Sequence, residues 1–141
     1  MKLSEVVGKH LTNVYVKYKL DVNGIDHSDL CLEIDGKTTI KFPWDFRDVN
    51  LKKRKKWRSK SMKRDAFFKP VRNAKIIDFL MLDDDDPMSA GFFELHDGKI
   101  IYEVTAFPSG AMAAGLNILP SADSINELFD KKFIRYSDNS S

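Results

Sequence analysis

Basic side chains are concentrated in one stretch, LKKRKKWRSKSMKR, from Leu51 to Arg64. Nine of its residues are Lys or Arg, none is acidic, and Phe67 and Phe68 follow closely. Such cations pair with phosphates, and aromatic rings such as Trp57 stack on bases. The candidate nucleic-acid contacts are therefore Lys52, Lys53, Arg54, Lys55, Lys56, Trp57 and Arg58. Neither helical nor strand periodicity fits this basic strip. A solvated connection anchored by Trp57, or a docking site for a protein, is the alternative.

Four consecutive carboxylates form a second charged feature, and Pro87 follows them, as in a turn between strands. A calcium loop needs a glycine at its sixth position, where this chain has Met88. Rows of exposed carboxylates attract basic proteins over long distances. We therefore expect a protein-contact patch made of Asp83, Asp84, Asp85, Asp86, Met88, Phe92 and Phe93. A simple exposed turn, or a turn that neutralises the basic strip, is the alternative.

Residues that could catalyse a reaction are present, but none has the spacing of a known site. The histidines, the single cysteine and the carboxylates expected on strands are His10, His27, His96, Cys31, Glu33, Glu94 and Glu103. Gly110 and Gly115 have phosphate-loop spacing, but Leu116 and Asn117 replace the required Lys and Ser or Thr. The sequence thus predicts no catalytic residue, no metal site and no cofactor.

Length and composition suit one folded domain over residues 1–141. Hydrophobic residues make up 43% of the chain and charged residues 31%. Glu5, Gly8 and Lys9 interrupt the start where a signal peptide needs an apolar stretch, and no apolar run is long enough to span a membrane. Cys31 is the only cysteine, so no intrachain disulfide can form. We expect a cytoplasmic protein that makes no membrane contact.

The chain contains two similar stretches, DLCLEIDGKTTIKF at 29–42 and GFFELHDGKIIYEV at 91–104. Asp-Gly between β-forming runs predicts a hairpin, because a type I′ turn needs positive φ at both central residues. The two Asp-Gly-Lys units are 62 residues apart (97 − 35), and residues 14–21 align with 76–83 at the same offset. A duplication of one hairpin-containing half explains this, and chance similarity of two β-meanders is the alternative.

Helices are predicted at both ends of this sheet. Leu3, Val6, Val7 and Leu11 follow helical spacing near the start, and Ile125, Leu128, Phe129 and Phe133 do so near the end. Ser121 or Asp123 is the expected N-cap of the second helix, or Ser124 in a capping box with Glu127. The predicted fold is α+β, with a mostly antiparallel sheet of about six strands. The basic connection covers about residues 46–72, and residues 137–141 form a frayed tail.

Because no catalytic pattern is found, the sequence favours a non-enzymatic protein-binding module. Size, fold class and acidic surface are analogous to those of bacterial immunity proteins, which bind and block a cognate toxin. The expected partner is a protein, such as a toxin with a basic active groove, whose phosphate-binding site the carboxylates would occupy. Nucleic-acid binding through residues 52–64 is the alternative. An enzyme built around the strand Glu and His positions is a third, weaker hypothesis.

Overall fold

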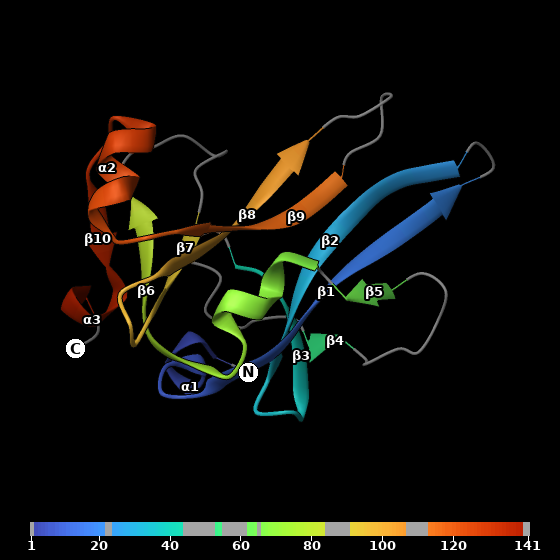
Figure 1. The fold of residues 1–141 in the computed structure, drawn as a ribbon, viewed down its shortest axis with the longest axis horizontal. Helices are drawn as coiled ribbons and strands as arrows, with labels where there is room; N and C mark the ends of the chain where they lie inside the picture. The colour runs from blue at the N-terminus through green and yellow to red at the C-terminus, as the bar shows by residue number, and fades with distance from the viewer. Residues whose placement is uncertain are drawn as a thin grey trace.

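The computed structural model describes residues 2–21, 24–43, 53–54, 62–64, 66–83, 91–106 and 113–139. These residues form an α+β fold with antiparallel strand pairing throughout and few helices (Figure 1), as predicted. The strands are β1 (His10–Asp21), β2 (Gly24–Ile34), β3 (Thr38–Lys41), β4 (Lys53–Arg54), β5 (Met62–Arg64), β6 (Ala74–Leu82), β7 (Gly91–Leu95), β8 (Ile100–Ala106), β9 (Ala113–Leu119) and β10 (Phe133–Arg135). The helices are α1 (Leu3–Val6), the 3-10 helix η1 (Ala66–Val71), α2 (Asp123–Phe129) and α3 (Tyr136–Asn139).

The strands follow the order β4-β3-β2-β1-β6-β7-β8-β9, while β5 pairs with β1 and β10 pairs with β6. The described residues thus contain ten strands where the sequence predicted about six. Three of the additional strands, β4, β5 and β10, are two or three residues long, too short to show an alternating pattern. Two of these, together with η1, lie within the connection predicted at 46–72.

Both predicted hairpins are present, but their turns differ. Asp35 and Gly36 have φ values of 53° and 69°, which is the positive pair that a type I′ turn requires. In the second hairpin the turn begins one residue earlier relative to its Asp-Gly-Lys unit, since the Gly98 amide donates to the Leu95 carbonyl. Only Gly98, with φ 91°, is left-handed there. The same tripeptide therefore occupies different turn positions in the two hairpins.

The main core lies between the inner faces of the two parts of the sheet. Val14, Leu32 and Ile40 are neighbours on adjacent strands β1, β2 and β3, and all are fully buried. Phe42, directly after β3, contacts the Phe93 ring of β7 edge-on, with centroids 5.3 Å apart. Sheet segments from both ends of the chain therefore share one core.

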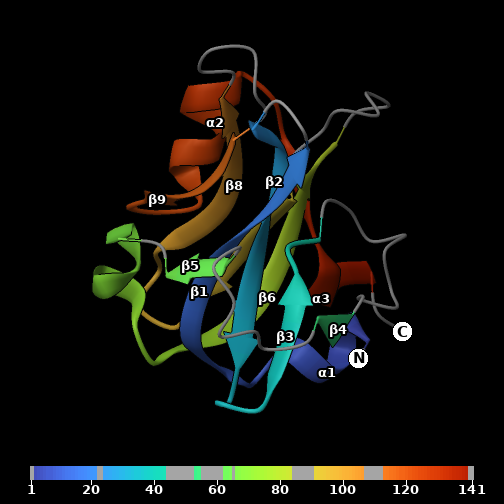
Figure 2. The ribbon, with the colours of Figure 1, turned by 90° about the vertical axis from the view of Figure 1, so that its right-hand side faces the viewer.

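Helix α2 covers the outer face of β7 and β8 and lies beside β8 in Figure 2, while β10 pairs with β6 within the sheet. The Phe129 ring of α2 packs edge-on against Phe92, with centroids 5.5 Å apart, and against Tyr102 at 5.9 Å. Ile125 of the same helix is fully buried. Both faces of β7 are consequently covered, one by the main core and the other by α2.

Chain ends and helix caps differ from the predictions in detail. The N-cap of α2 is Ala122, without a side-chain cap. Leu11 belongs to β1 because Gly8, with φ 93°, ends the first helical segment. Ser137 lies in α3 and donates two hydrogen bonds to Asp78, so the predicted frayed tail is anchored at its first residue. Among the described residues, no helix is long and apolar enough to cross a membrane.

Candidate functional site

The acidic tract begins at the end of β6, beside the C-terminal end of α2. Asp83 is exposed, and its backbone amide donates to the Lys132 carbonyl at 2.8 Å. Asp84, Asp85, Asp86 and Met88 lie outside the described residues. Asp83 is thus bonded to Lys132, which lies two positions after Asp130, the C-cap of α2.

The prediction that Phe92 and Phe93 contact a partner needs correction. Both side chains are fully buried, Phe93 against Phe79 at 5.0 Å between centroids and Phe92 against Phe129. Adjacent side chains of a strand point to opposite faces, so two consecutive phenylalanines in GFFEL indicate a strand covered on both faces. These two residues stabilise the scaffold instead of contributing to its surface.

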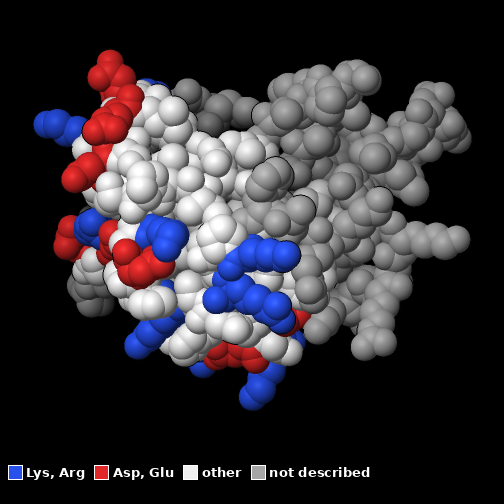
Figure 3. Space-filling model, viewed as in Figure 1, with Lys and Arg blue, Asp and Glu red and all other residues white. Residues whose placement is uncertain are grey.

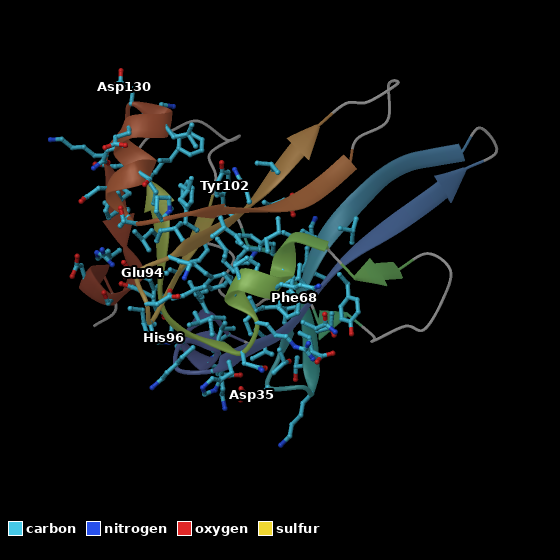
Figure 4. The ribbon with its side chains drawn as sticks, viewed as in Figure 1. Asp35, Phe68, Glu94, His96, Tyr102 and Asp130 are labelled. Atoms are coloured by element: carbon cyan, nitrogen blue, oxygen red, sulfur yellow. The ribbon has the colours of Figure 1, made fainter. Side chains whose placement is uncertain are left out.

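The exposed side of α2 carries acidic residues that were not predicted to contact a partner. Asp123 and Glu127 are exposed and have i, i+4 spacing, which puts them on one face of the helix, and the exposed Asp130 caps its C-terminal end in a left-handed conformation. Figure 3 shows acidic side chains along this edge of the molecule, and Figure 4 places Asp130 at the tip of α2. We call these three residues the acidic helix face. The 3.6-residue period would have found Asp123 and Glu127.

An apolar side chain accompanies the acidic helix face. Leu128 is 56% exposed, more than the two other large exposed hydrophobics of the described residues, Ile77 and Val104. The helix itself is rigidly placed, because its neighbours Ile125 and Phe129 pack onto the sheet. A fixed helix with an exposed leucine beside carboxylates can bind an apolar pocket with a basic rim.

Much of the basic strip lies outside the described residues. That part includes Lys52, Lys55, Lys56, Trp57 and Arg58. Lys53 and Arg54 belong to β4, opposite Ile40 and Thr39 of β3. The end of the strip, Met62–Arg64, forms β5 against β1. The strip is therefore fastened to the sheet near both of its ends.

A polar cluster lies on the outer face of β1 and β2, and we call it the Glu33 cluster. Glu33 is 5% exposed and accepts hydrogen bonds from the Thr12 hydroxyl at 3.0 Å and the Tyr15 hydroxyl at 3.3 Å. The Asn13 amide donates to the Tyr15 oxygen at 2.8 Å. On the adjacent strand, the buried Thr39 hydroxyl makes no hydrogen bond among the described residues. The cluster therefore ties Glu33 of β2 to two side chains of β1.

A second polar cluster, the Arg135 cluster, joins the C-terminal segment to β6 and β7. The Arg135 guanidinium forms a forked pair with the Glu94 carboxylate, and its Nη1 lies 3.5 Å from Asp78 Oδ2. The hydrogen bond with Glu94 raises the pKa of Arg135 above its usual value. Ser137 donates to Asp78 from its amide at 3.1 Å and from its hydroxyl at 2.7 Å. These charge-assisted contacts hold β10 and the start of α3 to β6 and β7.

The candidate histidine and cysteine chemistry is not assembled in the described part of the chain. Cys31 is fully buried, as expected for a small apolar residue on a strand. His96 lies in its predicted hairpin turn, where Nδ1 accepts the Lys75 amide at 3.2 Å. Within the described ranges, no three His, Cys, Asp or Glu residues are grouped to hold a metal ion.

The two hairpin turns lie at one end of the molecule, as the positions of Asp35 and His96 in Figure 4 show. The His10 amide donates to Asp35 Oδ1 at 2.8 Å and lowers the pKa of that carboxyl, and Lys9, 3.7 Å away, adds to the effect. In the other turn, Lys99 Nζ lies 2.6 Å from Asp97 Oδ2 and lowers the pKa of Asp97. Each of these carboxylates is paired with groups in or next to its own turn, and this pairing stabilises the two turns.

Comparison of the chain with protein-family models, with curated proteins and with solved structures found no match.

Proposed function

We propose that this chain is a non-enzymatic protein-binding module, most simply a cytoplasmic inhibitor of the immunity-protein type that blocks a cognate bacterial toxin. The observation that carries the proposal is the exposed Leu128 beside the acidic helix face. Asp83, at the start of the acidic tract, is hydrogen-bonded close to the same helix end. In the proposed interface Leu128 supplies an apolar contact and the carboxylates supply charge, a combination that is usual in protein interfaces.

The partner that fits this surface has a basic groove with an apolar pocket. Carboxylates brought near lysines and arginines accelerate association, while a buried leucine slows dissociation. An inhibitor of this kind needs no catalytic residue of its own, because covering the groove of the partner suffices. The carboxylates would stand where that groove otherwise holds phosphate.

The test is affinity capture from lysate of the source organism, with and without nuclease, using wild type and two charge-matched variants. One variant is Asp123→Asn with Glu127→Gln on the acidic helix face. The control is Glu5→Gln with Asp138→Asn, two exposed acids elsewhere. We expect one stoichiometric protein that survives nuclease and is retained by the control, with about tenfold weaker capture by the α2 variant. Equal capture by both variants would contradict the proposal.

Nucleic-acid binding is the second candidate, and the described residues add one observation in its favour. Lys69 and Arg72 are exposed in and just after η1, which follows β5 closely, so further cations adjoin the basic strip along the chain. Figure 3 shows blue side chains in the region of η1. This candidate predicts binding that falls steeply with salt and is lost after nuclease. It also predicts weaker binding when Lys53 and Arg54 are changed to Gln.

A further inference from the structure

The order of strand pairings is the same in the two parts of the chain. β1, β2, β3 and β4 form a meander, and β6, β7, β8 and β9 form another. β5 pairs with β1 where β1 also pairs with β2, so β5 must lie on the opposite edge of β1. β10 has the same relation to β6 and β7. The two meanders meet where β1 pairs antiparallel with β6, His10 opposite Lys75.

One irregularity of each meander coincides as well, although β1 has a second one, between Lys19 and Leu20. A bulge lies between Leu11 and Asn13 in β1 and between Ile76 and Asp78 in β6. These positions correspond at an offset of 65 residues (76 − 11), whereas the hairpin β2–β3 corresponds to β7–β8 at 61 (95 − 34). The gapless 62-residue offset of the sequence lies between these values. A bulge is a specific local feature, and its repetition at one register is stronger support for duplication than shared strand content.

Side chains at equivalent positions repeat their hydrogen bonds. Asn13 Oδ1 accepts the next amide, Val14, at 3.0 Å, and Asp78 Oδ1 accepts that of Phe79 at 2.9 Å. Asn13 lies opposite Glu33, and Asp78 lies opposite Glu94, so each half places a glutamate on its outer face beside a second polar residue.

In the second half, the glutamate at this position is paired with an arginine of the fifth strand. Arg135 of β10 lies opposite Leu80 of β6 and binds Glu94. The residue equivalent to Leu80 in β1 is Tyr15, at the same offset of 65 (80 − 15). The residue opposite Tyr15 in β5 is Arg64. The backbone register therefore assigns Arg64 the position in the first half that Arg135 has in the second.

We propose that the two halves are copies of one structural unit and that Arg64 is coupled to Glu33 as Arg135 is coupled to Glu94. The coupling fastens the end of the basic strip to the outer face of the first half. The last arginine of the strip then has a structural role in place of a ligand-binding one. This inference is independent of the proposed protein partner.

A double-mutant cycle tests the coupling in the full chain by urea unfolding. The variants are Glu33→Gln, Arg64→Gln and the double change, with Lys63→Gln on the same strand as the control. We expect the folded-to-unfolded ratio to fall about tenfold or more for each single change. The ratio of the double variant should equal that of the less stable single variant. Lys63→Gln should leave the ratio within about twofold, and its effect should add to that of Glu33→Gln.

Additive effects of Glu33→Gln and Arg64→Gln, or equal effects of Arg64→Gln and Lys63→Gln, would overturn the proposal. If Glu33→Gln does not fold, Arg64→Lys supplies the second comparison in the native background. Lysine keeps the charge but loses the planar fork, so it should recover only part of the stability that Arg64→Gln loses. Full recovery, or no recovery beyond Arg64→Gln, would contradict a guanidinium–carboxylate pair.

Discussion

Arg135 is the residue that most clearly connects distant parts of the chain. Its guanidinium pairs with Glu94, and it also lies beside Asp78, 57 positions earlier (135 − 78). The two carboxylate side chains are only 12% and 7% exposed. Loss of the cation would leave these acids without their main neutralising group, which is costlier than loss of a surface ion pair.

We therefore predict that Arg135→Gln lowers the free energy of unfolding by roughly 1–3 kcal/mol, reduced from the fully buried case because the arginine is partly exposed. Arg72→Gln, an exposed arginine, is the matched control and should change it by less than about 0.5 kcal/mol. Urea unfolding followed by tryptophan fluorescence measures both. Equal effects of the two substitutions would mean that the Arg135 cluster contributes nothing to the free energy of unfolding.

Asp35 gives a prediction for acid pH. The His10 amide and the Lys9 charge lower its pKa from the ordinary value of 3.8 in the folded state. A carboxyl with a lowered folded pKa stabilises the protein above its unfolded pKa, and this contribution is lost as pH falls through the folded pKa. Wild type should thus be more stable than Asp35→Asn at pH 7, with the difference shrinking below about pH 4.

Asparagine suits this substitution because it accepts the left-handed conformation of Asp35, so turn geometry is kept. Asp138→Asn is the control, since this exposed carboxylate lies outside the turn. Thermal unfolding across pH 2–7 measures the difference. A gap between wild type and Asp35→Asn that stays constant over this range would contradict the pKa argument.

At the scale of elements, α2 contains both residues that pack against the sheet and residues that are exposed for binding. Phe129 packs on Phe92 and Tyr102, whereas its neighbour Leu128 is mostly exposed. Phe129→Ala should lower the free energy of unfolding by about 2–4 kcal/mol, near the lower end for a buried aromatic because the ring is only partly buried. Leu128→Ala should cost less than about 0.5 kcal/mol.

The same pair has opposite expected effects on partner binding. Leu128→Ala should weaken capture of the partner by at least tenfold while stability is retained. Phe129→Ala should affect binding only to the extent that α2 detaches, which amide exchange of residues 123–129 would report. A Leu128→Ala protein that binds like wild type would remove the apolar centre from the proposed interface.

Local patterns predicted elements well and contacts poorly. Hairpins at both Asp-Gly units and the buried Cys31 follow from turn chemistry and strand alternation, which act over a few residues. The outer covering of β7 by α2 joins residues far apart in sequence, so Phe92 was assigned to the surface instead of the core. Three very short strands carry too few side chains to show a period.

The candidate site was predictable only in part for the same reason. The acidic helix face has a spacing visible in the sequence, but the neighbouring tract beginning at Asp83 is brought to it by the Lys132 hydrogen bond. Glu94 could be assigned to a strand, whereas its partner Arg135 lies beyond two intervening strands and α2. Strand register decides such pairs, and the sequence offset of 62 residues differs from the structural offsets by three residues for β1 and β6 (65 − 62) and by one for the hairpins (62 − 61).

At the scale of the whole molecule, charge is unevenly distributed. Nine of the 23 basic residues lie between Leu51 and Arg64, so the remaining 14 are outnumbered by 21 acids. A protein partner with a basic groove and a nucleic acid would therefore bind different surfaces of this chain. The surface that a natural partner covers distinguishes the two functions.

The most direct measurement is hydrogen–deuterium exchange of the chain, free and in complex with the captured partner. Our account predicts new protection in residues 123–130 and at Asp83, with the two hairpin turns around Asp35 and Asp97 unchanged. Protection confined to residues 51–64, with α2 exchanging as in the free chain, would contradict the proposed interface and assign binding to the basic strip.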